Sequence, residues 1–342
     1  MREDVAVSGG HAFMRSGPQG NQGGRWAGEQ FLKALKEGRP IGPAELRTND
    51  TLQRDEWIAF DNAIVEEAQI RLRVVSALIG AGLSSTIPNG MAKTLFMYDK
   101  MTDMGPAVVS LDGMSKSEND TVEFEEDGVP LPITHKDYYI NIRRLSASRL
   151  RGESLDTSMA RAAGRKIGEE TERMLLQGGK KFGAYTIYGL TNHPSRETAS
   201  FGTNGSWNQT AKTGENIIAD IGTLMAAAEA NRMYGPWWII AAGNMSTKFA
   251  EDFKANSDRT IRERIMAIDG IQNLIVADQM PASQVVMVQA TRDVVEMKIG
   301  EPLQNIQWDI EGGMQVNFKA MTIMVPVIKT DTEDRSGIVH MS

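Results

Sequence analysis

The stretch that most constrains this chain is residues 153–177, whose pattern predicts one long amphipathic helix. Apolar or small side chains recur about every four residues, as a stripe of Leu155, Met159, Ala163, Ile167, Thr171, Met174 and Leu175. The opposite side is charged, with Arg161, Arg165, Lys166, Glu169, Glu170, Glu172 and Arg173. Ser154 or Asp156 is expected to cap the first turn, and Gly178-Gly179 to end the helix. At a rise of 1.5 Å per residue the helix is about 35 Å long, so we expect it to act as a spine.

Composition limits the class of protein. A chain of 342 residues suggests about two domains, and 41% hydrophobic with 24% charged residues is ordinary for a soluble globular protein. The net charge of −7 argues against a general nucleic-acid binder, and the absence of cysteine excludes disulfides and thiolate metal sites. The N-terminus lacks a signal-peptide core, and the longest apolar run, Met321–Ile328, is far below the about 20 residues that span a membrane. We therefore expect a soluble protein, made in the cytoplasm, without a membrane partner.

The first third of the chain predicts an arm, a helix and a long hairpin. Residues 1–54 are mostly polar and glycine-rich up to Gly24, so we expect an arm that orders against another surface, with a disordered tail as the alternative. A second amphipathic helix is expected at Asp55–Val75, with one apolar face formed by Trp57, Phe60, Ile64, Ala68 and Leu72.

Residues 88–135 predict a two-stranded hairpin with a polar tip at Gly113–Thr121. Each arm approaches about 20 residues, which would reach about 60 Å if fully extended. A lone hairpin of that length is unstable in water and leaves its edges unpaired. We therefore expect it to lie on a neighbouring copy of the chain; a flap folded back on its own chain is the alternative.

The remaining pattern predicts alternating helices and strands. A strand at Tyr138–Arg144 leads into the spine, residues 179–213 are expected to be a long connection, and a helix follows at Thr213–Met233. Short helices are expected near Met245–Phe253 and Asp258–Ala267. Strands are expected at Trp237–Ala241, Asn273–Asp278, Gln284–Gln289, Val294–Ile299, Ile306–Ile310 and Met314–Ile328. Residues from Lys329 onward are expected to form a polar tail.

No catalytic motif is present. The sequence has no nucleophile elbow, phosphate loop, zinc-protease motif or dinucleotide fingerprint. The four histidines are scattered, and we expect each to lie on the surface or to form hydrogen bonds, with His11 and His340 in flexible ends and His135 and His193 between them. The acidic group near Asp331 lacks calcium-loop spacing. We therefore predict no catalytic, cofactor-binding or metal-binding residue and no cofactor.

Charge is unevenly distributed around the hairpin and the start of the spine. The returning arm is acidic, with Glu118, Asp120, Glu123, Glu125, Glu126 and Asp127. The segment before the spine is basic, with Arg143, Arg144, Arg149 and Arg151, and the excess continues through Arg161, Arg165 and Lys166. We hypothesise that these acids and bases meet between copies and set their register; two solvated faces are the alternative. Raised salt would weaken such a contact, because exposed charge pairs are screened.

The order of these elements resembles the major capsid proteins of tailed bacteriophages, the Hong Kong 97-type fold, and the related encapsulin shell proteins. Three stretches carry the resemblance: DEWIAFDNAIVEEAQIRLRVVSALIGAGL, PLPITHKDYYINIRRLSASRLRGESLDTSMARAAGRKIGEETERMLLQG and GPWWIIAAGNMSTKFAEDF. It implies an α+β fold with an N-terminal arm (1–54), a helix and first strand (55–89), an extended loop (90–133), a peripheral domain with the spine helix (134–189), an axial domain (190–300), and peripheral return strands with a C-terminal tail (301–342). Some members cross-link a lysine to an asparagine, but nothing here selects a pair among Lys93, Lys100, Lys116, Asn305 and Asn317, so we predict none.

The resemblance implies a structural subunit, and not an enzyme, that self-assembles as hexamers and pentamers into an icosahedral phage head. The head would enclose double-stranded DNA through non-specific contacts, with portal, scaffolding or cement proteins as further partners, and the protein would reside in the virion. The long arm favours the phage capsid over the alternative, an encapsulin-type compartment that sequesters a cargo enzyme. A third alternative is a metal-free α+β enzyme whose long loop is a lid.

Overall fold

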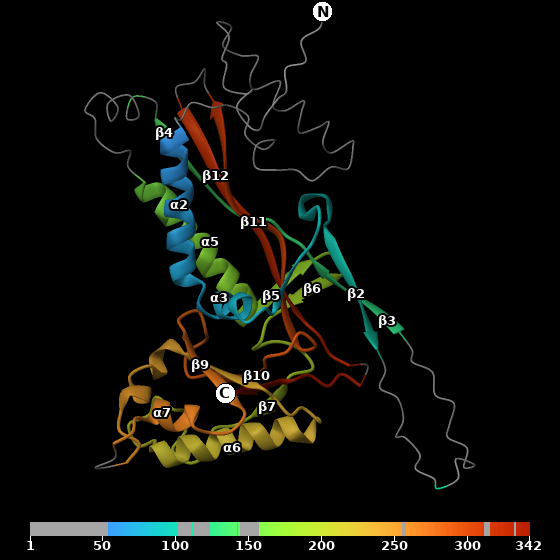
Figure 1. Ribbon diagram of the computed structural model, residues 1–342, viewed down its shortest axis with the longest axis vertical. Coiled ribbons are helices and arrows are strands. Elements are labelled where there is room, and N and C mark those ends of the chain that lie inside the picture. Colours follow the sequence, from blue (N-terminus) through green and yellow to red (C-terminus); the bar gives the residue numbers. More distant parts are fainter. Residues whose placement is uncertain are drawn as a thin grey trace, which may run out of the picture.

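The computed structural model describes residues 54–101, 111, 124–141, 143, 157–254, 258–310, 315–331 and 333–342 (Figure 1). Its helices are α2 (Arg54–Arg71), α3 (Arg73–Gly80), α5 (Ser158–Leu176), α6 (Gly214–Ala230) and α7 (Ile261–Met266), with 3-10 turns η1 (Gly90–Ala92), η2 (Gly243–Met245) and η3 (Lys248–Ala250). Its strands are β1 (Ser84–Thr86), β2 (Leu95–Met101), β3 (Phe124–Pro130), β4 (Thr134–Asn141), β5 (Gly178–Phe182), β6 (Tyr185–Tyr188), β7 (Glu197–Ala199), β8 (Trp237–Ala242), β9 (Ile271–Ala277), β10 (Val285–Gln289), β11 (Val295–Ile310), β12 (Gln315–Ile328) and β13 (Ile338–Met341).

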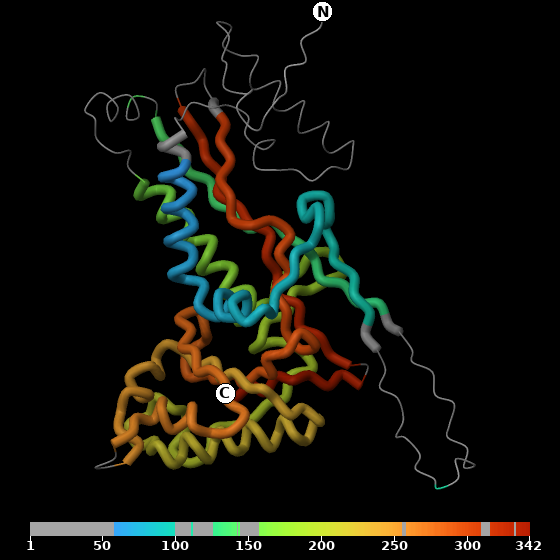
Figure 2. The backbone as a smooth tube through the Cα atoms, in the orientation of Figure 1, coloured from blue at the N-terminus to red at the C-terminus, as the bar shows by residue number. Residues whose placement is uncertain are grey.

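Two sheets organise the molecule. The first has the strand order β1-β11-β12-β4, and its three long strands are antiparallel neighbours. The second has the order β7-β13-β10-β8-β9 and mixes parallel and antiparallel pairs. The β11–β12 ribbon runs from the far end of the first sheet toward the second (Figure 2). The ribbon connects the two sheets, because Val295, Met297 and Ile328 at this end share a core with Ile240 and Val286 of the second sheet.

The predicted spine helix is α5, which packs against α2 and covers one face of the first sheet (Figure 1). The packing is close because α5 carries glycine where the helices cross. A Cβ atom on Gly164 would overlap the carbonyl oxygen of Ile64, and one on Gly168 would lie 2.8 Å from the carbonyl oxygen of Ala68. On the other helix, Phe60 stacks on Phe318 of β12 with ring centroids 5.6 Å apart. The predicted apolar faces are confirmed where their residues are buried, at Phe60, Ile64 and Ala68 of α2 and at Ala163, Ile167, Thr171, Met174 and Leu175 of α5; the two crossing glycines were not part of the predicted stripe.

Three details of the spine differ from the prediction. Met159 is 40% exposed although it lies on the predicted stripe. The helix begins at Ser158 with Thr157 as its N-cap and no side-chain capping bond, while Ser154 and Asp156 lie outside the described residues. Glu172, predicted on the charged side, is buried.

The single helix predicted at Asp55–Val75 is wrong: the chain breaks at Leu72 and forms α2 and α3. Glu172 of α5 explains the break. Its carboxylate accepts hydrogen bonds from the backbone N–H groups of Val74 and Val75, at 2.8 and 3.2 Å. These are N-terminal N–H groups that a new helix leaves without intrahelical partners. A residue about a hundred positions away therefore starts α3.

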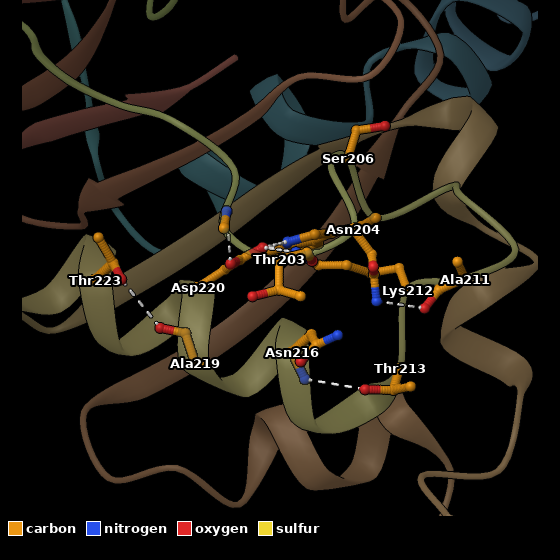
Figure 3. A network of polar contacts seen from close by, with 12 residues as sticks. Thr203, Asn204, Ser206, Ala211, Lys212, Thr213, Asn216, Ala219, Asp220 and Thr223 are labelled. Carbon is orange, nitrogen blue, oxygen red and sulfur yellow. Dashed lines mark hydrogen bonds and ion pairs between the residues drawn. The ribbon is translucent and has the colours of Figure 1, made fainter.

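The predicted long connection at 179–213 contains more structure than expected. It holds the β5–β6 hairpin and β7, followed by a loop that buries Trp207. Figure 3 shows how this loop is fastened to α6. Asp220 of α6 lies 2.6 Å from the Nζ atom of Lys212 and accepts hydrogen bonds from Trp207 and from the backbone N–H of Gly202, while Lys212 donates to the carbonyl oxygen of Thr203 at 2.9 Å. The loop is ordered by a buried ion pair.

The predicted polar tail after Lys329 is also wrong. Residues Ile338–Met341 form β13, a fully buried strand that pairs with β10 on one side and β7 on the other. His340, predicted in a flexible end, is therefore buried. A pattern of four apolar residues beside a polar stretch is too short to be recognised in the sequence. The strand forms because β10 and β7 both pair with it.

The strands predicted at Val294–Ile299 and Ile306–Ile310 are one strand, β11, with register shifts after Ile299 and Glu301. Gly300 lies at the first shift, where the backbone of Gly90 crosses so closely that a Cβ atom on Gly90 would overlap Gly300. This crossing is where the chain leaves the body toward the extended hairpin. The strand predicted at Tyr138–Arg144 is β4, which begins earlier, at Thr134.

Candidate assembly surface

The extended hairpin leaves the body as the ribbon β2–β3, which points away from both sheets (Figure 1). Its register runs from Leu95 opposite Pro130 to Met101 opposite Phe124, which confirms the base of the predicted hairpin. The tip at Gly113–Thr121 and most of the predicted length of both arms lie outside the described residues. Where the rest of the hairpin rests therefore stays a prediction.

One face of the ribbon is anchored to the body by apolar contact. Phe96, Tyr98 and Val129 pack in a cluster with Met174 of α5 and Ile187 of β6. The two aromatic rings stack on each other with centroids 6.3 Å apart. The base of the hairpin thus has a fixed direction, because it continues the core beneath the sheet.

A buried charged group supports the same anchor. The Nζ atom of Lys298 lies 4.6 Å from the centre of the Phe96 ring, 2.9 Å from the carboxylate of Glu296 and 2.7 Å from the hydroxyl oxygen of Ser85. Lys329 adds a second ammonium 3.2 Å from Glu296. Burial tends to raise the pKa of Glu296, but hydrogen bonds from Lys298, Ser85 and Lys329 outweigh it and lower the pKa to about 2. The anchor is therefore charged at neutral pH.

The acidic residues proposed for contact between copies have different surroundings in the structure. Glu126 of β3 is exposed, directly opposite the exposed Asp99 of β2 in the register. Asp127 is engaged within its own chain, because the Tyr98 hydroxyl donates to its carboxylate at 3.0 Å. Burial, together with Asp127, raises the pKa of Tyr98. Glu125 lies in β3 opposite Lys100, and Glu118, Asp120 and Glu123 lie outside the described residues.

The basic residues of the same hypothesis are mostly undescribed. Arg143 is exposed just beyond β4, while Arg144, Arg149 and Arg151 lie outside the described residues. Within the part of the chain that the structure describes, no ion pair joins Arg143 to Glu126. Two like charges facing each other across a ribbon, as Asp99 and Glu126 do, are unfavourable unless a cation lies between them. The hypothesis that a neighbouring copy supplies this cation stays a prediction.

Two of the histidines that the structure describes, His193 and His340, form hydrogen bonds in the body. Arg196 donates to the Nδ1 atom of His340 at 3.3 Å, and the Nε2 atom of His340 lies 3.1 Å from the side-chain oxygen of Gln284. The backbone N–H of Ser195 donates to the Nδ1 atom of His193. Burial, with Arg196 beside it, lowers the pKa of His340. The two contacts of His340 hold β13 to Arg196 and Gln284.

Among the described residues, no group of acidic and histidine side chains is arranged to hold a metal ion. In the same part of the chain, none of the helices is long and apolar enough to cross a membrane.

The combination of a spine helix on a long-stranded sheet, an anchored extended hairpin and a second αβ unit is that of a Hong Kong 97-type capsid fold, as the sequence predicted. Three solved structures share it. One is the virus-like particle from Pyrococcus furiosus, with a TM-score of 0.61 and 17% identity over 84% of this chain and 99% of that one. The capsid of Myoviridae phage XM1 has a TM-score of 0.58 and 15% identity over 77% and 91%. A structure of Mycobacterium phage Bobi has a TM-score of 0.53 and 11% identity over 76% and 88%.

Sequence comparison places the chain more narrowly. Residues 47–341 match the model of a protein family described as a family of unknown function, DUF6260, and the chain belongs to that family. Comparison with curated proteins gives no match.

Proposed function

We propose that this protein is the major capsid protein of a tailed bacteriophage, a structural subunit that self-assembles into an icosahedral head around double-stranded DNA. The observation that carries the proposal is the anchored β2–β3 ribbon in a Hong Kong 97-type fold. Its base is fixed on the core, and the ribbon points away from the body (Figure 1). A two-stranded ribbon is not stable alone in water, so its distal part needs another surface.

The proposed mechanism is geometric. Residues 90–133 overlap a neighbouring subunit, the peripheral domain (134–189 with the strands after 301) forms the continuous shell, and the axial domain (190–300, joined by β13) surrounds the five-fold and six-fold axes. Head-to-tail contacts of this kind form rings when the rotation between subunits closes after a whole number of copies, here five or six. DNA contact would be weak and non-specific, consistent with a net charge of −7. Portal, scaffolding or cement proteins complete the proposed partners, and the assembled protein would reside in the virion after synthesis in the host cytoplasm.

Negative-stain microscopy of the purified full chain tests the proposal. We expect closed shells or rings of five and six subunits. Particles isolated from the native source should contain double-stranded DNA that resists nuclease until the shell is broken. A chain that stays monomeric at every concentration and salt condition would refute the proposal.

The alternative is an encapsulin-type compartment, and the likeness to the Pyrococcus furiosus virus-like particle keeps it in view because that match covers 99% of the other chain. Particle contents separate the two functions. An encapsulin predicts a co-purifying cargo protein and little nucleic acid, whereas the phage head predicts the reverse.

The proposed charged contact has its own test, a swap of exposed charges. Glu126→Lys should weaken assembly by placing a cation where the neighbour's arginines are expected, and combining it with Arg143→Glu should restore part of the loss. Glu229→Lys, an exposed acid on α6, is the matched control. Light scattering during assembly measures the effect. If Glu126→Lys and the control behave alike, the two charged segments do not meet.

A further inference from the structure

The strand β4 presents a long free edge. It is the last strand of the four-stranded sheet, and its eight residues pair with β12 alone. Within the described residues, its backbone has no hydrogen bond beyond that pairing. Most of its side chains are exposed, namely His135, Lys136, Asp137, Tyr139 and Asn141. An edge of this length is a template for another strand unless the protein protects it.

Among the end strands of the two larger sheets, the others are short or protected. β1 and β7 have three residues each. β9 is longer, but two arginines cover its outward carbonyl oxygens: Arg262 donates to Leu274 at 2.9 Å and Arg73 donates to Val276 at 3.2 Å. Of the two long end strands of these sheets, the fold therefore covers β9 with side chains and leaves β4 open. An open end strand of eight residues can pair with a further strand.

Charge on β4 does not prevent pairing. Asp137 lies 3.6 Å from Lys319 on the neighbouring strand β12, so its charge is balanced within the sheet. Lys136 is a single cation with a long aliphatic stem that can lie along an apolar neighbour. The rest of the strand is rich in residues that favour sheets, among them Tyr138, Tyr139 and Ile140.

We infer that the β4 strands of two copies pair antiparallel across a two-fold axis and join their sheets into one. A two-fold axis brings identical surfaces together, so the strand must be complementary to itself. Centring the pair on Lys136 or Asp137 would place identical charges opposite each other, which is unfavourable. Centring it on Tyr138, Tyr139 or Ile140 places no like charges opposite within the strand. A centre at 139 places Tyr139 opposite its own copy and Tyr138 opposite Ile140, whereas a centre at 138 or 140 places Tyr139 opposite Asp137 or Asn141.

The sequence disfavours the N-terminal segment as the occupant of this edge. Residues 1–53 are rich in glycine and contain proline, and they have no run of β-branched and aromatic residues. The inference rests on the proposed function in one respect, because an assembled shell is what holds the two copies at a shared axis.

Cysteine cross-linking tests the pairing directly, since the chain has no cysteine of its own. Residues opposite each other in an antiparallel pair have Cβ atoms about 5 Å apart, close enough for a disulfide. Tyr139→Cys should form dimers if the pair is centred on 139. Asp137→Cys with Tyr139→Cys reports a centre at 138, and Tyr139→Cys with Asn141→Cys reports one at 140. Tyr234→Cys, in the loop after α6, is the control: its side chain is 76% exposed against 55% for Tyr139.

We expect disulfide dimers after oxidation of the particles. A centre at 139 gives them in all three variants, because each carries Tyr139→Cys, whereas a centre at 138 or 140 gives them in one double variant alone. The control should remain monomeric. The inference fails if none of the three variants exceeds the control. It also fails if Tyr139→Cys instead cross-links to Val7→Cys, because the N-terminal segment would then fill the edge. Microscopy of the same samples keeps the proposals apart. Particles without cross-links refute only the strand pairing, and cross-linked dimers without particles refute only the shell.

Discussion

Two buried acidic residues, Asp220 and Glu172, contribute to the fold through different kinds of partner. Asp220 has a buried cation beside it and three donors in total, from Lys212, Trp207 and Gly202. Glu172 has only two backbone N–H groups, with the exposed Arg73 nearby. The first carboxylate is therefore sensitive to loss of its partner, and the second is sensitive to pH.

Removing the cation beside Asp220 should be costly. Lys212→Met should lower the free energy of unfolding by about 3–5 kcal/mol, because it leaves a carboxylate buried without its counter-ion. Lys254→Met is the matched control, since Lys254 pairs with Glu215 on the same helix but both side chains are more than half exposed. Its effect should stay within about 1 kcal/mol. Urea unfolding measures both, and equal losses would show that burial of the ion pair is unimportant.

Glu172 should make stability fall as pH rises. Burial raises its pKa from 4.5 to about 7, against the two backbone N–H groups and Arg73, which favour the ionised form. Between these two values the folded chain keeps a proton that the unfolded chain has released, so the free energy of unfolding decreases across that window. The loss approaches about 3 kcal/mol at the upper end.

The variant Glu172→Gln should remove this component. We expect the difference in free energy of unfolding between Glu172→Gln and the unmodified chain to change across pH 4.5 to 7, in the sense that the variant gains relative stability as pH rises. Glu66→Gln, an exposed residue on α2, is the control and should give a difference that is nearly flat. A flat difference for Glu172→Gln as well would contradict the argument.

At the scale of elements, α2 and α5 can cross closely because α5 has glycine, which carries no side chain, at the crossing. Gly164 and Gly168 bring the backbones of the two helices into contact, although glycine disfavours a helix by about 1 kcal/mol relative to alanine. The residues between them provide the apolar and charged faces. The two glycines therefore allow α5 to pack closely on α2, but they lower the helical propensity of α5.

Gly164→Ala should lower the free energy of unfolding by about 1–3 kcal/mol, because the added methyl group meets the Ile64 carbonyl oxygen and pushes the helices apart. Gly222→Ala on α6 is the opposite case: nothing lies within 4 Å of its new methyl group. That variant should raise the free energy of unfolding by up to about 1 kcal/mol. Chemical denaturation of the two proteins side by side measures the contrast, and the same sign of change in both would contradict it.

For the whole molecule, the strand β13 joins two cores. Ile338 lies in the core that α3, α5 and β11 share, while Val339 and Met341 lie in the core beneath α6. Alternate residues of one strand point to opposite faces of a sheet, so four residues reach both cores at once. Without it, β10 would become an edge and β7 would lose its strand partner in the sheet.

Deleting residues 337–342 should therefore prevent the chain from folding. We expect loss of soluble protein, because the deletion removes apolar contacts from both cores and exposes a buried strand edge. Deleting Ser342 alone, whose side chain is exposed, is the control and should leave solubility unchanged. Soluble yield and circular dichroism measure the outcome. A soluble, folded deletion variant would support the polar tail that the sequence suggested.

The sequence was sufficient for several structures that depend on residues close to one another along the chain, although the short β5–β6 hairpin was not predicted. The period of α5 predicted its buried Ala163 and Ile167, Thr213 predicted the start of α6, and the base of the β2–β3 hairpin followed from two arms on either side of a polar tip. The order of these elements was also sufficient to indicate the fold class. Periodicity is a local property, and each of these features can be detected in a short window.

Several features that the sequence did not predict depend on a distant partner. The break at Leu72 depends on Glu172, and β13 depends on the gap between β7 and β10. Lys212 and Asp220 are close in the chain, but their ion pair forms only in the folded loop. The open edge of β4 likewise becomes visible only when the edge of β9 is seen to be covered. A short pattern states which face of a segment is apolar, but it does not state which other segment lies against that face. That choice is made by the packing of the whole chain.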